Sequence, residues 1–123
     1  SHNATISGNV FRGCRMSPVV ISGGRNIAIT GNTIIDNGKD WAKGKPDPES
    51  YAGILLGAAS RIVITGNRIG NTADNATQSY GVYETESCAD NTIFGNDLTN
   101  NAAGALMLKG KNTKASSNRG TDN

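Results

Sequence analysis

The chain has 123 residues and a net charge of +2, with 16 glycines and only 5% aromatic residues. This length allows a single domain. No apolar run approaches the ~20 residues of a membrane-spanning helix, and lysine and arginine are scattered, so neither a membrane nor a nucleic acid is an expected partner. The composition predicts a small glycine-rich domain whose core uses few bulky side chains.

The N-terminal pair Ser1-His2 is typical of a cleaved expression tag, so we exclude residues 1–2 and expect the domain at 3–123. His2 is the only histidine, and Cys14 and Cys88 show no metal-ligand spacing. We therefore predict no metal site and no cofactor on this chain.

One segment recurs five times, as ATISGNVF (4–11), IAITGNTI (27–34), IVITGNRI (62–69), NTIFGNDL (91–98) and a weaker TKASSNRG (113–120). Each copy carries a Gly or Ser followed by an asparagine, at positions 9, 32, 67, 96 and 118. The asparagine spacings are 23, 35, 29 and 22 residues. The repeat is therefore 22 or 23 residues long, with insertions in the second and third intervals.

A second segment lies between these copies, as PVVIS (18–22), GILLG (53–57), GVYET (81–85) and GALML (104–108). Its first residue precedes the next repeat asparagine by 14, 14, 15 and 14 residues. Both segments are short, β-branched and alternate with period two, which predicts strands. Because equivalent strands recur every ~22 residues, we expect them to stack in parallel as a solenoid with columns of isoleucine as its core.

The repeat asparagines are predicted to adopt the left-handed conformation at a corner and to hydrogen-bond the copies above and below. A second polar ladder is expected at the other end of the same strand, six residues upstream, from Asn3, Asn26, Arg61, Asp90 and Asn112. These positions support corners rather than bind sugar. Cys14 and Cys88 fall at different corners two coils apart, which predicts two free thiols.

The stretches GILLGAASRIVITGNRI (53–69) and GVYETESCADNTIFGNDL (81–98) resemble the repeat of the pectate-lyase-like superfamily of right-handed parallel β-helices. The resemblance covers residues 3–120 and implies an all-β, single-stranded right-handed parallel β-helix of about four to five coils. That superfamily includes polysaccharide lyases, glycoside hydrolases, epimerases and tailspike depolymerases, alongside proteins without known catalysis. It implies a secreted, extracellular or virion-associated protein with a polysaccharide partner. We expect this chain to be the C-terminal coils of a longer protein. The resemblance is compatible with calcium binding by that parent protein.

Two insertions, at 36–50 and 70–79, should leave the same corner of successive coils. The resemblance implies that such loops wall a saccharide groove beside the outward residues of the next strand. Alternation predicts those outward residues as Val20, Leu55, Tyr83 and Leu106.

Most candidate site residues fall in the first insertion. The candidate catalytic residues are Asp36, Asp40, Glu49 and Glu84, and the candidate substrate-binding residues are Trp41, Lys43 and Tyr83. Aromatic rings would stack on pyranose rings, lysine would meet uronate carboxylates, and paired acids would serve as general acid and base. The alternative is a solvated loop with Trp41 folded back over the coil corner.

Glu84 falls in a predicted inward column with Ile21, Leu56 and Met107, where an unpaired carboxylate is costly. A β-bulge near residues 84–90 would either rotate it outward or give it backbone donors.

The favoured function is that of a polysaccharide-binding and -processing β-helix, a lyase or glycoside hydrolase acting on an acidic polysaccharide. The alternative is a non-catalytic structural or adhesive β-helix of a phage tailspike or cell-surface protein, which would be a homo-oligomer and, in a tailspike, a trimer. A flat apolar strip from Val20, Leu55, Leu106 and Leu108 would suit that alternative.

Overall fold

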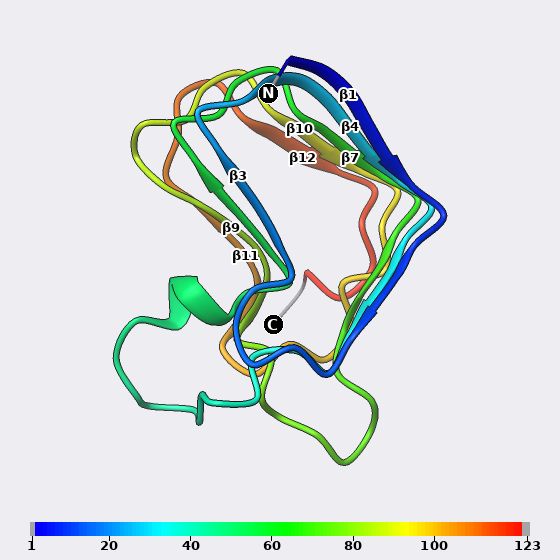
Figure 1. Ribbon diagram of the computed structural model, residues 1–123, viewed down its shortest axis with the longest axis vertical. Coiled ribbons are helices and arrows are strands. Elements are labelled where there is room, and N and C mark those ends of the chain that lie inside the picture. The colour runs from blue at the N-terminus through cyan, green and yellow to red at the C-terminus, as the bar shows by residue number, and fades with distance from the viewer. Residues whose placement is uncertain (1, 122–123) are drawn as a thin grey trace.

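A computed structural model describes residues 2–121 of the chain. Figure 1 looks along the stack of coils and shows a roughly three-sided cross-section, in which strands of successive coils lie side by side. All strand pairs are parallel, and the residues of each strand pair with their copies in the neighbouring coils. The predicted all-β parallel β-helix is confirmed.

The strands form three sheets, one on each side of the coil. Sheet A contains β1 (His2–Ser7), β4 (Arg25–Thr30), β7 (Val63–Thr65), β10 (Thr92–Phe94) and β12 (Lys114–Ser116). Sheet B contains β2 (Val10–Arg12), β5 (Thr33–Ile35) and β8 (Arg68–Gly70), and isolated bridges extend it to Asp97 and Arg119. Sheet C contains β3 (Val19–Ser22), β6 (Ile54–Gly57), β9 (Tyr80–Glu84) and β11 (Gly104–Leu108).

The described structure begins one residue before the expected domain start at residue 3. His2 already belongs to β1, where it pairs with Arg25 of β4. Ser1, the other residue of the expected tag remnant, lies outside the described residues.

The core is a set of stacked columns, as predicted. Ile29, Ile64 and Ile93 point inward from sheet A, and all three are fully buried. Ile34, Ile69 and Leu98 do the same from sheet B. Each branched side chain packs on its own copy in the next coil, so a chain with few aromatic residues still fills its interior.

The repeat asparagines form the predicted hydrogen-bonded ladder. The backbone N–H and Nδ2 of Asn32 donate to Asn67 Oδ1 at 2.9 and 3.0 Å, and Asn67 in turn donates to Asn96 Oδ1 at 3.0 Å through both groups. The predicted left-handed backbone is misplaced by one residue, because it belongs to the residue before each asparagine, as at Gly66 (φ +70°) and Ser117 (φ +57°). This left-handed residue turns the chain, so the side chain of the asparagine that follows points into the corner.

The second predicted ladder is a column of left-handed corners. Positive φ angles of 55 to 59° occur at Asn3, Asn26, Arg61, Asp90 and Asn112. Their side chains are exposed, so these positions share a backbone conformation rather than a buried polar network. Asparagine and aspartate accept this conformation more readily than other residues, which explains their recurrence here.

A different buried ladder lies at the corner between sheets B and C. Asn37 donates to Gln78 Oε1 at 3.0 Å, and Gln78 donates to Asn101 Oδ1 at 3.1 Å. These residues are 41 and 23 positions apart, because the insertions separate them, so no regular spacing reveals the column. The ladder stacks the coils at the corner from which the insertions leave.

The predicted register of the last coil is wrong by one residue. Leu106 pairs with Val82 and Leu108 with Glu84, so both leucines pack against the core while Met107 joins the outward column beside Tyr83. The cause is the turn from sheet C to sheet A, which differs in length between the last two coils. Ala89 and Lys111 form a bridge there, five residues after Glu84 in one coil and three after Leu108 in the next.

Cys14 and Cys88 are both free, as predicted. Within residues 2–121 the only helical segment is the 3₁₀ turn η1 (Pro48–Tyr51), and no helix is long and apolar enough to cross a membrane.

We predict that Asn67→Ala lowers the free energy of unfolding by about 3 kcal/mol, because it leaves the Asn32 amide and the Ile29 carbonyl without their buried partner. Asn9→Ala is the matched control, since Asn9 is exposed at the end of the same ladder, and its loss should stay below about 1 kcal/mol. Urea unfolding of both variants measures this. Equal losses would show that the ladder does not stabilise the stack.

Candidate functional site

Both insertions leave the helix at the corner between sheets B and C (Figure 1). The first, between β5 and β6, folds back so that η1 packs beside β9. The Ser50 carbonyl accepts a hydrogen bond from the Ser17 amide at 2.9 Å, and the Tyr51 carbonyl accepts one from the Ser79 amide at 3.1 Å. Because these bonds tie η1 to two different coils, the insertion forms a fixed wall along the outer face of sheet C.

The outward column of sheet C consists of Val20, Leu55, Tyr83 and Met107, paired coil by coil. Met107 takes the place predicted for Leu106. We call this column, together with η1, the sheet C groove. It contains an apolar hollow of about 210 Å³ lined by Met16, Ser17, Val20, Ser50 and Leu55. A smaller polar hollow of about 120 Å³ is lined by Glu49, Tyr83, Thr85, Glu86 and Lys109.

Lys109 is the cation of the groove, and its Nζ lies 5.2 Å from the centre of the Tyr83 ring. Its pKa is raised above the ordinary value by its polar contact with Tyr83 and then by the negative charges of Glu86 and Glu49. Lys109 therefore carries its positive charge throughout the physiological pH range.

Tyr83 does not offer the open stacking face expected of it. The residue is only 7% exposed, Lys109 covers the ring, and Tyr80 packs edge-on with 5.6 Å between ring centres. It supports the floor of the groove and holds Lys109 in place.

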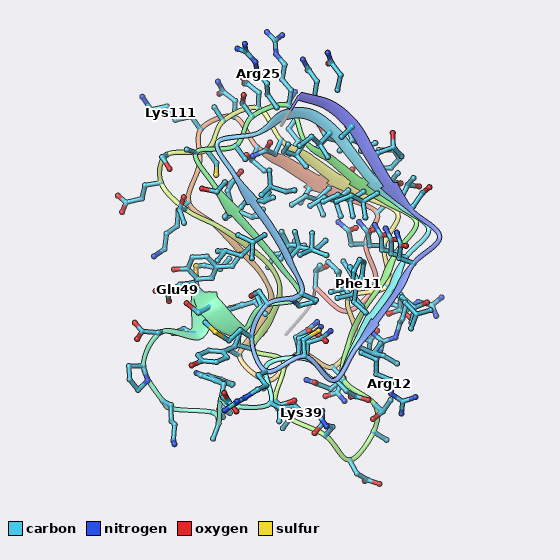
Figure 2. The ribbon with its side chains drawn as sticks, viewed as in Figure 1. Phe11, Arg12, Arg25, Lys39, Glu49 and Lys111 are labelled. Carbon is cyan, nitrogen blue, oxygen red and sulfur yellow. The ribbon has the colours of Figure 1, made fainter. Side chains whose placement is uncertain are left out.

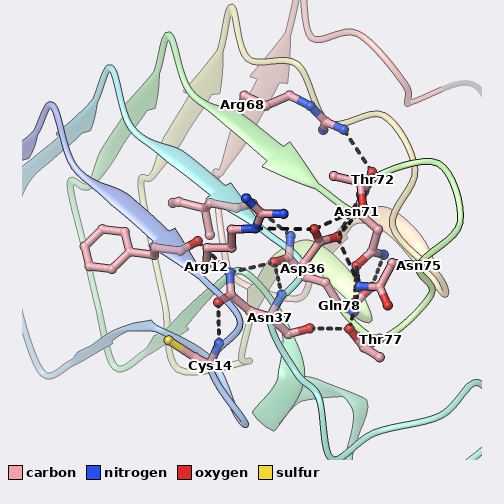
Figure 3. A network of polar contacts seen from close by, with 12 residues as sticks. Arg12, Cys14, Asp36, Asn37, Arg68, Asn71, Thr72, Asn75, Thr77 and Gln78 are labelled. Carbon is pink, nitrogen blue, oxygen red and sulfur yellow. Dashed lines mark hydrogen bonds and ion pairs between the residues drawn. The ribbon is translucent and has the colours of Figure 1, made fainter.

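Asp36 fastens the two insertions together (Figure 3). Its carboxylate accepts hydrogen bonds from the Thr72 backbone N–H at 2.8 Å, the Thr72 hydroxyl at 3.0 Å and the Asn75 side-chain Nδ2 at 3.0 Å. Arg12 Nε lies 3.9 Å from the same carboxylate. Burial raises the pKa of Asp36, but the hydrogen bonds from Thr72 and Asn75, with the charge of Arg12, outweigh it and lower the pKa. These contacts make Asp36 the fastening between two loops.

Three other predicted residues lie away from the groove. Asp40 accepts a hydrogen bond from Arg15 Nε at 2.9 Å. Trp41 is only 5% exposed and its indole N–H donates to the Lys45 carbonyl at 3.2 Å, so the ring folds back into the loop and cannot stack on a sugar. Lys43 is exposed on the same loop.

Glu84 points into the core and is fully buried. Its carboxylate accepts hydrogen bonds from Asn91 Nδ2 at 2.7 Å, from the Gly110 amide at 2.8 Å and from the Thr113 hydroxyl. A Cβ on Gly110 would lie 2.7 Å from the Glu84 carboxyl carbon, so the glycine makes room for it. Glu84 therefore does not rotate outward but gains a backbone donor, the second of the two predicted arrangements. Because the carboxylate is fully buried, substrate cannot reach it.

The four predicted acids therefore do not converge, and Glu49 alone among them faces the groove (Figure 2). Lys109 and Glu86 are functional candidates that the sequence prediction missed. A correct register for the last coil would have found Lys109, since it follows directly on the Leu108–Glu84 pair. Across residues 2–121, no group of three or more acidic, cysteine or histidine residues is arranged to hold a metal ion.

A family model described as a right-handed beta helix region matches residues 1–123. No curated protein and no solved structure matches the chain. The family match agrees with the parallel coils and adds their handedness to the description.

The contacts of Asp36 predict a specific pH dependence. Because its folded pKa lies below the ordinary value of 3.8, its stabilising effect is complete above that value and is lost as the pH falls through the lower folded pKa. The NMR shift of the Thr72 amide should therefore titrate with a midpoint below pH 3.8. In Asp36→Asn this titration should disappear. A Thr72 transition above the ordinary aspartate pKa would contradict the assignment.

The buried position of Glu84 predicts that Glu84→Gln lowers the free energy of unfolding by about 2 kcal/mol, because the new amide group must face one of three donors. Glu86→Gln is the control on the exposed side of the same turn and should change stability by less than about 0.5 kcal/mol. Thermal or urea unfolding measures both. A Glu84→Gln protein as stable as the parent would show that the carboxylate is not a structural acceptor.

Proposed function

The chain belongs to the right-handed β-helix family, and from this premise we propose that it binds an acidic polysaccharide along the sheet C groove. The observation that carries the proposal is Lys109, a protonated cation beside two carboxylates in a groove walled by η1. In this proposal the chain is part of a polysaccharide-processing protein of the pectate-lyase-like kind, secreted or carried on a virion.

The groove supplies the contacts that an acidic sugar requires. Lys109 would pair with a uronate carboxylate, and Glu49 and Glu86 would accept hydrogen bonds from sugar hydroxyls. The apolar hollow beside them would pack against the C–H face of a neighbouring ring. The outward column crosses four strands, a length of about 14 Å at the usual strand spacing, so an extended oligosaccharide would lie along the stack.

Acid–base catalysis in the sheet C groove would fall to Glu49 and Glu86, the two carboxylates that line it. Asp36, Asp40 and Glu84 are held by other contacts. Lys109 is an unsuitable base for a lyase step, because its raised pKa keeps it protonated. The described contacts therefore favour binding as the function. If the protein also cleaves its ligand, Glu49 and Glu86 would serve as the acid pair of a hydrolase.

One observation favours a structural or adhesive role instead. Val63 and Phe94 are 36% and 42% exposed on the outer face of sheet A, away from the groove. Of the apolar strip predicted from Val20, Leu55, Leu106 and Leu108, Val20 and Leu55 lie on the outer face of sheet C, whereas Leu106 and Leu108 pack against the core. In this second candidate, sheet A would be the contact face of a trimer, and a strictly monomeric parent protein would count against it.

We predict that Lys109→Gln weakens binding of polygalacturonate about threefold to fivefold, since it removes one exposed charge pair. The loss should shrink as salt is added. Lys114→Gln is the matched control, because Lys114 is an exposed lysine on sheet A, and it should bind like the parent. Calorimetric titration measures both. Equal weakening in the two variants, or no binding by the parent, would contradict the proposal.

A further inference from the structure

Three polar side chains meet inside the last two coils, at places that earlier coils fill with apolar residues. Glu84 pairs with Leu56 of the coil before it. Asn91 and Thr113 follow Ile62 in the column that directly precedes the strands of sheet A. Replacing a buried polar group and its partners by apolar side chains of the same shape is often neutral or stabilising. Stability alone therefore does not explain why this cluster is polar.

The Glu84 carboxylate holds two groups that can react with each other. Its Oε2 accepts hydrogen bonds from Asn91 Nδ2 at 2.7 Å and from the Thr113 hydroxyl. Its Oε1 is held by the Gly110 backbone N–H at 2.8 Å, which fixes the orientation of the carboxylate. A hydroxyl nucleophile and the nitrogen of a side-chain amide thus share one carboxylate oxygen, and the two residues come from neighbouring strand ends of sheet A.

The side-chain carbonyl of Asn91 is polarised by a backbone donor. Asn91 Oδ1 accepts a hydrogen bond from the Ile62 N–H at 2.9 Å. A backbone N–H in this position stabilises the negative charge that forms on the oxygen when a nucleophile adds to the carbonyl carbon. Glu84 is fully buried and Asn91 is 1% exposed, so bulk water has little access to that carbon. The cluster therefore contains a base, a nucleophile, a leaving group and an oxyanion donor.

We propose that the Thr113 hydroxyl displaces ammonia from the Asn91 side chain and forms an ester cross-link between the last two coils. Glu84 Oε2 takes the hydroxyl proton while Thr113 Oγ1 adds to Asn91 Cγ, and the Ile62 N–H stabilises the resulting oxyanion. When the C–N bond breaks, Glu84 returns the proton to Nδ2, which leaves as ammonia. Glu84 ends as a carboxylate, and the step requires no oxidant, reductant or cofactor.

The cross-link would fasten the last strand of sheet A. β12 lies at the edge of that sheet beside β10, and all three of its residues are exposed. A covalent loop from Asn91 to Thr113 limits the freedom of the unfolded chain and hinders the last coil from separating. The reaction uses no residue that lines the sheet C groove, so it stands or fails independently of carbohydrate binding.

Intact-mass spectrometry of the full chain, kept at neutral pH, tests the proposal. The protein should weigh about 17 Da less than its sequence, because one ammonia is lost as the ester forms. Trypsin should release peptide 69–109 joined to peptide 112–114, since cleavage follows Arg68, Lys109, Lys111 and Lys114. Hydroxylamine, which cleaves esters, should separate the two peptides.

Four variants identify the reacting groups. Thr113→Val and Glu84→Gln should keep the full mass. Thr113→Ser should still lose ammonia, because it keeps the hydroxyl group. Thr92→Val is the matched control, since Thr92 is a partly exposed threonine next to Asn91, and it should lose ammonia like the parent.

Three outcomes would overturn the proposal. A parent protein of full mass would show that the ester does not form. A mass loss that persists in Thr113→Val would exclude this hydroxyl as the nucleophile. A mass loss located at Asn37–Gly38, without linked peptides, would show that a cyclic imide forms there instead.

Discussion

The structure depends on one constraint, that every coil must place its corners directly above those of the coil before it. Parallel strands hydrogen-bond only when their copies stay in register, and buried corner amides need partners that no strand supplies. The Asn32–Asn67–Asn96 ladder meets this need with side chains that bond both backbone and one another. Once the corners are fixed, isoleucines of successive coils meet automatically, and large insertions can leave one corner without disturbing the stack.

The same constraint decides what the sequence could predict. Residues that repeat with the coil were visible, so the strands, the isoleucine columns and the asparagine ladder were found. The Asn37–Gln78–Asn101 ladder was not, because insertions of unequal length separate its members and glutamine replaces asparagine in the middle. The register of the last coil could not be predicted, because the turn from sheet C to sheet A is longer in one coil and shorter in the next. Counting residues to the following asparagine does not show how many of them belong to this turn.

The candidate site shows why composition alone was a weak guide. The first insertion holds the tryptophan and several acids, yet Trp41 folds into its own loop, Asp40 pairs with Arg15 and Asp36 fastens the second insertion. These side chains stabilise the structure of the insertion corner. Of the charged groups that face the groove, Glu49 comes from the first insertion, whereas Lys109 and Glu86 come from turns whose place depends on the register of sheet C. We therefore look for ligand-binding residues among the side chains that the corner contacts do not use.

The insertion corner borders the sheet C groove, and the proposed ligand contacts lie along this groove. A crystal structure of the chain soaked with a short oligogalacturonate tests this binding directly. We expect an oligosaccharide lying along the outer face of sheet C, with a carboxylate on Lys109 and a ring against Leu55. An oligosaccharide bound only on another face, with the groove unoccupied at saturating ligand, would contradict it.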